Sequence, residues 1–578
     1  MALFKGSKEA PPQAEGESAS ECMKVGQLLV DGGHITADNL AAALAQANGD
    51  LLQFADIVLG RFGAGRNELA MAISTATGVP AVDTKGIVIA DEIKGVLDEL
   101  IVRRHCAVAV AEEGTTLVVL CADPSPARRA AIEADAKRPV KFYISDPSSV
   151  RTFIDLVYRA DADVSRLVAS LEVADDQAKI AAIAAEISLD DQAPVIQLVN
   201  RIVSQAMRDR ASDIHIEPQD ENVRVRFRID GHLVVAFELP MGVHAALTSR
   251  LKIMSAMNIV EKRRPQDGQF STVIDGKEVD VRVASVATVF GEKIVMRILD
   301  KGRSMIGLAE LGFPRETYLH YSKMIHAPFG MVICAGPTGA GKTTTLYASL
   351  LEVNSAGKNI TTVEDPVEYV FPGINQIQTN DQAGLTFATG LKAILRQDPD
   401  VILVGEIRDA DTARIAVQSA LTGHLVLSSL HGTDSVAALH RFLDMGIEAF
   451  LIASSVVGVI GQRLLRRICD SCKEPYTPPA DELAVFRQNS GGSEKSTFYR
   501  GAGCNFCAGT GCRDRIGVYE LLRITPELRR LIVGWATTEE LRRLAVAQGM
   551  RTMLREAMAL VENDVTTIPE VVKTLFAA

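Results

Sequence analysis

The most specific chemistry in the sequence lies in a glycine-rich stretch. Residues 336–343 read GPTGAGKT, which fits the phosphate-loop pattern G-x-x-x-x-G-K-[ST], and they follow the apolar run 331–335. This order predicts a strand, a tight loop whose N–H groups point inward and the start of a helix, an arrangement that binds polyphosphate. We expect Lys342 to reach the β- and γ-phosphates of a nucleotide and Thr343 to coordinate Mg²⁺. The predicted nucleotide-binding residues are Gly336, Pro337, Thr338, Gly339, Ala340, Gly341, Lys342, Thr343 and Thr344.

A group of carboxylates follows the strand-like run 359–363. Glu364, Asp365 and Glu368 stand within five residues of one another. Carboxylates at the C-terminal end of such a strand can hold magnesium-bound water or activate the water that attacks a phosphate. Spacing does not separate the three, so each is a candidate for water activation.

A further acid follows the buried-strand run 401–404. The run leads into Gly405 and Glu406 and resembles a Walker B strand with one difference. Gly405 stands where an aspartate is expected, so the first acid is Glu406.

Two histidines bracket another apolar strand, 425–430. His424 precedes it and His431 follows it. A lone histidine commonly fills a core, but one directly after a strand of a nucleotide-binding sheet can hydrogen-bond a phosphate and respond to its loss. Both readings stay open on the sequence.

Four of the nine cysteines form two C-x-x-C pairs. In a reducing compartment, such pairs are better read as four thiolates around a structural Zn²⁺ than as disulfides. Cys512 lies nearby, but four thiolates already close a tetrahedral site, so we interpret it as a spare thiol. The predicted zinc ligands are Cys469, Cys472, Cys504 and Cys507.

Length and composition indicate a multidomain, non-membrane protein. The 578 residues suggest about three to five domains. No apolar run reaches 18 residues, and residues 1–20 are polar and small, so we expect neither a membrane-spanning helix nor a signal peptide. We therefore expect a cytoplasmic location. The formal charge of −11 argues against a general nucleic-acid coat.

Changes in pattern along the chain predict domain boundaries. A near-repeat in residues 23–74 predicts two helical hairpins, and alternating short runs predict a small α/β unit ending near residue 158. The predicted parts are a disordered tail (1–22), an N-terminal partner-docking domain (23–158), a linker (159–192), a β-rich domain (193–300), a short linker (301–312) and the nucleotide-binding domain (313–578), which includes a zinc-binding insert (466–520) and C-terminal helices (525–578).

The segment 193–300 reads as a helix followed mostly by strands. Alternation in 223–229 and the turn at Asp230-Gly231 predict a hairpin, and Asp275-Gly276 predicts a second one. Arg282 and Arg297 lie in the last strands. On the sequence alone, each is best read as a solvated charge on a strand face.

These motifs together give the chain a resemblance to the secretion ATPases of the type II secretion and type IV pilus assembly family, in its zinc-containing extension and secretion branch, from about residue 24 to the C-terminus. The resemblance implies an α/β multidomain fold, in which a RecA-like P-loop NTPase core follows a β-rich, PAS-like domain and an α+β N-terminal domain. Besides the phosphate loop and the cysteines, it rests on 211–218 (ASDIHIEP), 228–231 (RIDG), 265–268 (PQDG), 364–368 (EDPVE), 405–409 (GEIRD) and 422–424 (TGH).

The resemblance also implies a function and partners. It implies a homo-hexamer that couples ATP hydrolysis to assembly of a pilus or pseudopilus through an inner-membrane platform protein. The N-terminal domain would dock the cytoplasmic domain of an assembly protein, membrane contact would come only through partners, and no nucleic acid is implied. The shared motifs do not separate a secretion system from a pilus.

The resemblance changes the expected roles of single residues. Arg282 and Arg297 fall on paired arginines that reach the γ-phosphate, where planar guanidinium groups would neutralise developing charge. Glu368 matches the water-activating glutamate and Glu406 the Walker B acid. The catalytic residues implied are Glu368, Glu406, Arg282, Arg297, Lys342, Glu364, His424 and His431, with Mg²⁺ on Thr343.

Departures and alternatives concern mainly the N-terminal domain. Some relatives bind cyclic di-GMP through an Arg before a Leu-Gly pair, but here those places read KVG (24–26) and QFA (53–55), which argues against such binding. A non-hydrolysing scaffold or second-messenger receptor fits the complete set of acids poorly. A DNA translocase would share the core, but no basic stretch with interleaved aromatics is present.

Overall fold

The computed structural model describes residues 15–158, 164, 167–168, 193–274, 277–300, 306–492, 495–507 and 509–576, with gaps at 83, 85–86, 88, 90–92 and 94. It divides into two compact units, Met1–Arg166 and Leu167–Ala578, which are treated separately below. In the ranges just given, no helix is long and apolar enough to cross a bilayer. Residues 1–14 of the predicted tail, nearly all of the predicted linker 159–192, the turn 275–276 and residues 301–305 lie outside the described residues.

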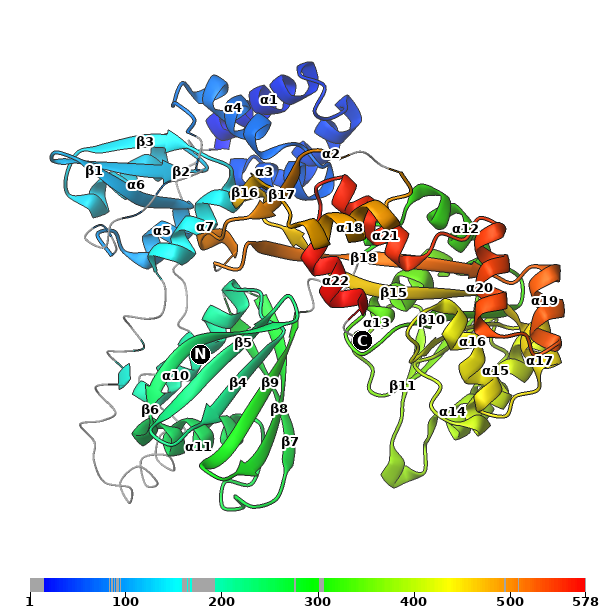
Figure 1. Cartoon of the computed structure of the whole chain (residues 1–578). Coiled ribbons are helices and arrows are strands. Elements are labelled where there is room, and N and C mark those ends of the chain that lie inside the picture. Colours follow the sequence, from blue (N-terminus) through cyan, green and yellow to red (C-terminus); the bar gives the residue numbers. More distant parts are fainter. Residues whose placement is uncertain are drawn as a thin grey trace, which may run out of the picture. The chain divides into compact units, whose positions relative to one another are not determined.

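The first unit opens with the helices α1 to α4, drawn in blue in Figure 1. Val25 and Phe54, which are equivalent in the sequence repeat, are both fully buried, and so is Leu69. The first helix begins at Glu15, so the predicted tail 1–22 is helical over its last part. The helices are α1 Glu15–Asp31, α2 Ala37–Ala47, α3 Leu51–Arg61 and α4 Arg66–Thr77.

A small α/β layer completes this unit. Its three-stranded sheet has the order β1-β2-β3, with β1 antiparallel and β3 parallel to β2. The elements are α5 Glu99–His105, β1 Ala107–Glu113, β2 Thr116–Cys121, α6 Pro126–Ala136, β3 Val140–Ile144 and α7 Pro147–Val157.

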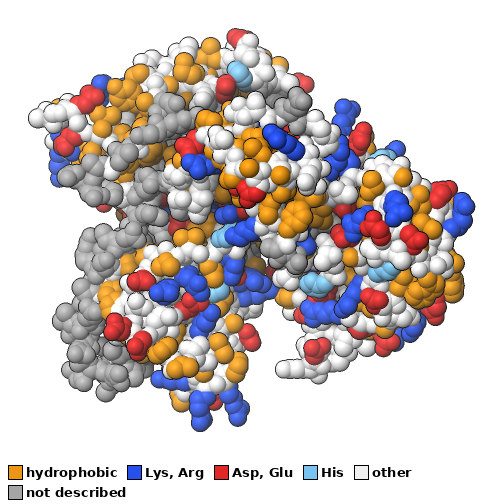
Figure 2. All heavy atoms as spheres, in the orientation of Figure 1, with side chains coloured by type: hydrophobic (Ala, Val, Ile, Leu, Met, Phe, Trp, Pro, Cys, Tyr) orange, Lys and Arg blue, Asp and Glu red, His pale blue; other side chains and the backbone are white. Residues whose placement is uncertain are grey.

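The second unit begins with the antiparallel β-domain that the sequence predicts. Its six strands have the order β6-β5-β4-β9-β8-β7, and Figure 1 shows them as one green layer with α10 and α11. One face is apolar and buried, as Ile214, Val281 and Met296 illustrate. Lysine and arginine side chains gather on the surface of this domain (Figure 2). The elements are α10 Pro194–Arg208, β4 Asp213–Pro218, β5 Asn222–Ile229, β6 His232–Pro240, α11 His244–Met254, β7 Gln266–Ile274, β8 Lys277–Thr288 and β9 Gly291–Asp300.

The predicted nucleotide-binding domain is built on a seven-stranded sheet of order β12-β11-β13-β14-β10-β15-β18, in which only the β15–β18 pairing is antiparallel. The strands predicted at 331–335, 401–404 and 425–430 are confirmed as β10, β13 and β14. The strands are β10 Gly330–Ala335, β11 Ile360–Glu364, β12 Asn375–Gln378, β13 Val401–Val404, β14 Leu425–Leu430, β15 Val456–Ile468 and β18 Cys512–Arg523.

Helices cover both faces of this sheet. On one face α13 packs over Val332 and Leu427, and on the other α15, α16 and α17 pack over Ile333 and Val426. The helices are α12 Arg315–Ile325, α13 Lys342–Val353, α14 Phe387–Ile394, α15 Ala410–Leu421, α16 Ser435–Asp444, α17 Ala449–Ser455, α19 Pro526–Val533, α20 Thr538–Ala547, α21 Met553–Glu562 and α22 Ile568–Phe576.

The cysteine-containing insert lies between the long paired strands β15 and β18. The last residue of β15, Ile468, and the first residue of β18, Cys512, both fall inside the predicted range 466–520. Its described residues form a two-stranded sheet and one α-helix. The elements are β16 Lys473–Tyr476, α18 Ala480–Asn489 and β17 Phe498–Gly501.

Candidate functional site

The phosphate loop joins β10 to α13 at the C-terminal edge of the parallel sheet. Gly339 and Gly341 have φ angles of 78° and 84°, which favour glycine. Thr343 is exposed at the head of α13, together with Thr344. The Lys342 Nζ donates to the carbonyl oxygens of Gly336 and Pro337 at 2.9 and 3.0 Å, and burial lowers the pKa of this lysine. The structure therefore brings the predicted nucleotide-binding residues together in one loop.

A buried glutamine, Gln462 on β15, contacts residues of the phosphate loop and of the elements on either side of it. Its Oε1 accepts hydrogen bonds from the Thr345 hydroxyl at 2.8 Å and from the Cys334 thiol at 3.3 Å. A Cβ on Gly336 would lie only 2.7 Å from the Gln462 carbonyl oxygen, so the loop requires glycine at this position. The sequence interpretation missed Gln462, although a polar residue inside an apolar strand was a usable signal.

The acids after β11 fall into two classes. Glu364 is 4% exposed and accepts hydrogen bonds from the Thr362 hydroxyl at 2.6 Å and from Gln376 at 3.1 Å, as well as from the Tyr347 hydroxyl. Glu368 has a side chain that is 29% exposed. Glu364 is thus held inside the fold, while Glu368 can reach a ligand.

Tyr347 connects these two acids. Its hydroxyl donates to Glu364 and accepts from the Glu368 N–H at 3.2 Å. Burial and, next, the hydrogen bond to Glu364 raise the pKa of Tyr347 far above its ordinary value. Because Tyr347 lies on α13, the helix that begins at the phosphate loop also fixes the acidic loop.

Glu406 follows β13 at the same edge of the sheet. Its Oε2 lies 3.5 Å from His431 Nε2, and its other carboxylate oxygen pairs with Arg408. Gly405 packs against β11, where a Cβ would lie 3.3 Å from the Glu364 Cα. The absence of a side chain at Gly405 therefore has a local reason in the close approach of the two strands.

His424 does not lie with this group, although the resemblance implies a role for both histidines. In the parallel β10–β14 pairing, Gly330 faces Leu425 and Ala335 faces Leu430. His431 therefore lies beside the phosphate loop, whereas His424 lies at the opposite edge, about 20 Å away along a six-residue strand. There the His424 ring nitrogen Nδ1 lies 3.0 Å from the Ser419 carbonyl oxygen.

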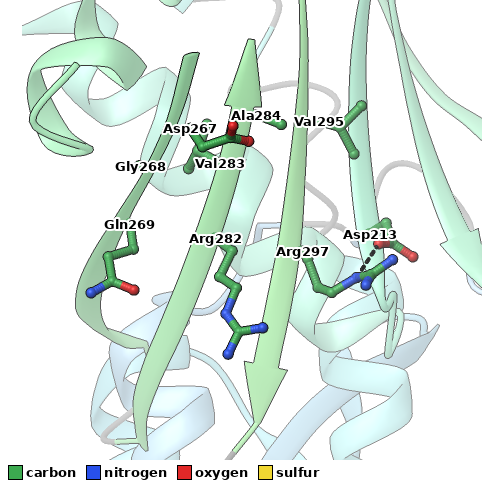
Figure 3. Close-up of a pocket in the computed structure, with 9 residues that line it drawn as sticks. All are labelled: Asp213, Asp267, Gly268, Gln269, Arg282, Val283, Ala284, Val295 and Arg297. Carbon is green, nitrogen blue, oxygen red and sulfur yellow. Dashed lines mark hydrogen bonds and ion pairs between the residues drawn. The ribbon is translucent and has the colours of Figure 1, made fainter. Parts of the chain in front are cut away.

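The two predicted arginines are direct cross-strand partners on β8 and β9. Both line an open pocket of about 490 Å³, and Figure 3 shows their guanidinium groups on the same side of the sheet. Arg297 Nε donates to Asp213 Oδ1 at 3.0 Å, while its side chain is 61% exposed. The buried Asp213, for which the sequence interpretation assigned no role, holds Arg297 in place. The pocket is lined by Asp213, Asp267, Gly268, Gln269, Arg282, Val283, Ala284, Val295 and Arg297.

Arg282 contacts the acidic loop of the nucleotide-binding domain. Its Nη1 lies 3.5 Å from Glu368 Oε2, and its Nη2 donates to the Val367 carbonyl oxygen at 3.1 Å. Arg282, the cross-strand partner of Arg297, therefore touches the loop that carries Glu368.

A second contact between these domains involves the turn at Asp230. Asp230 Oδ2 accepts from the Asp514 N–H at 3.0 Å, and Asp230 Oδ1 lies 3.9 Å from Arg515 Nε. The Asp514 side chain in turn pairs with Arg210. The hairpin turn that the sequence predicts is thus a contact point with the start of β18.

The four predicted cysteines form one cluster, in which the sulfur atoms lie within 4.8 Å of one another. The Cys469–Cys504, Cys472–Cys507 and Cys504–Cys507 sulfur pairs are separated by 3.8, 3.9 and 3.8 Å. A tetrahedral site with metal–sulfur bonds of about 2.3 Å places its sulfurs about 3.8 Å apart. The cluster therefore fits a tetrahedral metal ion.

Comparison with known proteins decides the family. A family model described as type II/IV secretion system protein matches residues 188–573, more than half of the chain. The chain belongs to this family. A second model, described as MshEN domain, matches residues 77–164. The predicted family and the predicted α/β multidomain fold are both confirmed.

The members of the secretion family that this chain is similar to carry names from two machines. The type IV pilus assembly ATPase PilB of Myxococcus xanthus is 37% identical over 95% of this chain and 98% of its own length. The type II secretion system protein HxcR of Pseudomonas aeruginosa is 45% identical over 66% of this chain and 78% of its own length. The type II secretion system ATPase E of Vibrio cholerae is 43% identical over 66% and 76%. The chain is thus a homologue of pilus assembly and secretion ATPases over most of its length.

Proposed function

We propose that this chain hydrolyses ATP and uses the energy to drive assembly of a type IV pilus or a type II secretion pseudopilus. The contact of Arg282 with Glu368 carries the proposal, because it joins a phosphate-binding type of side chain on one domain to a candidate water-activating acid on another. The names of the relatives support the process, and they leave both machines open.

In the proposed reaction, the phosphate loop binds ATP and Lys342 neutralises the β- and γ-phosphates. Glu368 accepts a proton from the attacking water, which raises the nucleophilicity of that water at the γ-phosphorus. As the water oxygen bonds to the γ-phosphorus, the bond from this phosphorus to the β,γ-bridging oxygen breaks, and ADP and phosphate leave. Arg282 and Arg297 stabilise the charge that spreads over the phosphoryl oxygens.

Mg²⁺ has suitable ligands in this site. The Thr343 residue is exposed at the start of α13, and Glu406 follows β13 at the same edge of the sheet. Such oxygen donors are those that Mg²⁺ prefers, and the bound ion would supply positive charge to the phosphate oxygens. We assign Thr343 as its protein ligand and Glu406 as the acid that orients its water.

We further propose that the four-cysteine cluster holds a structural Zn²⁺. The sulfur separations fit tetrahedral coordination, and the backbone N–H groups of Cys504 and Gly511 donate to the Cys507 sulfur at 3.2 Å, which favours a thiolate. Cys512 lies outside the cluster, as expected for a spare thiol. The ion would tie both ends of the insert together.

The proposal includes a homo-hexamer that acts on an inner-membrane platform protein, with the N-terminal domain docking the cytoplasmic domain of an assembly protein. Membrane contact then comes through these partners. The exposure of Arg297 supports a site that reaches beyond its own domain. Mass photometry of the purified chain with and without ATP tests the ring, and pull-down with the genomically neighbouring membrane proteins identifies the partner.

Replacing the phosphate-loop lysine tests the enzymatic part. Lys342→Ala should abolish ATP hydrolysis by the purified chain while leaving its circular dichroism spectrum unchanged. The exposed Lys392 on α14 provides the control Lys392→Ala, which should hydrolyse ATP normally. Equal turnover of Lys342→Ala and the unmodified chain would refute the proposed site.

A further inference from the structure

Arg463 on β15 is a deeply buried arginine beside the phosphate loop. Only 6% of the residue is exposed. Ala335, the last residue of β10, pairs with Gly461, so Arg463 lies two residues further along β15, level with the first residues of the loop. This position belongs to the edge of the sheet that carries Lys342 and His431.

Its guanidinium has no partner among the described residues of the chain. No side-chain hydrogen bond or ion pair involves it there, and its Nε is buried without an acceptor. By contrast, Arg466 on the same strand forms an ion pair with Glu570 at 2.6 Å. An unpaired buried charge is unfavourable, and arginine does not deprotonate at physiological pH. The fold therefore holds the positively charged Arg463 guanidinium without an acidic partner among the described residues.

The acidic side chains near Arg463 already have other partners, so none of them pairs with its guanidinium. Strand β15 passes against the start of α16, since a Cβ on Gly461 would lie 2.9 Å from the Ser435 nitrogen. Two acids lie in this region. Asp434, which caps α16, already pairs with Arg542 at 2.9 Å and caps the helix through two N–H groups. Glu520 on β18, opposite Gly461, already accepts from the backbone N–H groups of Ser435 and Met553 at 3.2 and 3.0 Å. Burial lowers the pKa of Lys342, and the charge of Arg463 acts on it in the same direction. Two cations thus stand beside the loop.

We propose that Arg463 is a further phosphate-binding residue of the nucleotide site, which contacts phosphate oxygens beside Lys342 from the α16 side of the sheet. The proposal rests on the proposed ATPase function. A polyphosphate supplies the negative charge that the buried guanidinium lacks, and the planar fork of arginine matches phosphate oxygens.

Equilibrium binding of a non-hydrolysable ATP analogue to the full chain tests this role. Arg463→Gln should weaken binding by tenfold or more, and Arg463→Lys should lose less because it keeps the charge. Arg467 on the same strand is exposed, and Arg467→Gln should bind like the unmodified chain. Equal affinity of Arg463→Gln and Arg467→Gln would overturn the inference.

Thermal unfolding separates phosphate binding from a structural role. Without nucleotide, Arg463→Gln and the apolar Arg463→Met should unfold at the same temperature as the unmodified chain or higher, because each removes an unpaired buried charge. The rise in Tm caused by the analogue should be smaller in both. A lower Tm without nucleotide together with an unchanged nucleotide-dependent rise would make Arg463 structural and refute the inference.

The same measurements separate a failure of the proposed ATPase function from a failure of the inference about Arg463. If the analogue binds neither the unmodified chain nor Arg467→Gln, the proposed function fails. If it binds both, and binds Arg463→Gln equally well, only the inference about Arg463 fails.

Discussion

Arg282 Nη1 lies 3.5 Å from Glu368 Oε2, and the two residues come from different domains of the second unit. The partly exposed pair joins the arginine-bearing sheet to the loop that follows β11. An arriving γ-phosphate would compete with Glu368 for Arg282, and Glu368 would then be free to act on water. This competition makes the acid and the arginine separately testable.

Replacing the acid should separate binding from hydrolysis. Glu368→Gln should lower ATP turnover by roughly 100-fold or more, as expected for loss of a general base, while nucleotide affinity stays within about threefold. Steady-state hydrolysis and fluorescence titration measure the two quantities. Glu352 is exposed on α13, and Glu352→Gln should turn over normally. Unchanged turnover of Glu368→Gln would move the water-activating role to Glu364 or Asp365.

Removing the Tyr347 hydroxyl should destabilise the acidic loop. Tyr347→Phe removes the hydroxyl that donates to Glu364 Oε2 and leaves the Glu368 N–H without that acceptor, which should cost about 1–3 kcal/mol of unfolding free energy. The folded-state pKa of Tyr347 is raised, so its contribution is complete below the unfolded value of about 10 and disappears as the pH rises above it. The difference from Tyr347→Phe in denaturant unfolding should therefore narrow above about pH 10. Tyr318→Phe is the control, and an equal loss there would contradict the prediction.

Asp213 should affect ATP turnover because it holds the Arg297 guanidinium in position. Asp213→Asn keeps the shape of the side chain but removes the charge that holds the guanidinium, and ATP turnover should fall about tenfold, with a smaller effect on nucleotide binding. The comparison is Asp220→Asn, an exposed change between β4 and β5. Wild-type turnover in Asp213→Asn would show that Arg297 does not depend on this carboxylate.

Metal analysis tests the cysteine cluster. The purified chain should contain about one zinc per molecule, and Cys507→Ser or a strong chelator should lower the unfolding free energy by several kcal/mol. Cys512→Ser should retain the zinc. A zinc content near zero under reducing conditions would exclude the site.

The two histidines should behave differently. His431→Gln alters a side chain 3.5 Å from Glu406 and should lower ATP turnover, by roughly tenfold if it helps to position that acid. His424→Gln changes a contact at the other edge of the sheet and should leave turnover within about twofold. Equal losses in both variants would mean that His424 acts on the site by a route that the single chain does not reveal.

The sequence was informative where chemistry depends on neighbours along the chain. The phosphate loop, the acids after β11 and β13 and the paired C-x-x-C knuckles are local patterns, and each lies where its flanking strand predicts. Parallel strands then carry the phosphate loop and the two acidic loops to one edge of the sheet without any further specification. For the same reason, the sequence already indicated that His424 and His431 lie at opposite edges of the sheet, because one precedes the strand and the other follows it.

The sequence was silent where a residue works through a distant partner. Asp213 beside Arg297, Gln462 beneath Gly336 and Arg463 beside the loop are brought into place by strand order, which no local pattern encodes. Their residue types gave only a weak signal, a polar or charged side chain inside a strand that is otherwise apolar.

The Asp230 turn has a mechanical consequence. Its carboxylate accepts a hydrogen bond from the uncharged Asp514 N–H, whereas the Arg282–Glu368 pair contains a cation that an anion can attract. If the second contact opened while the first held, the β-domain would turn about the first. Asp230 would then be the fulcrum of a lever whose moving arm ends at Arg282, and the length of that arm would set the stroke of each ATP cycle.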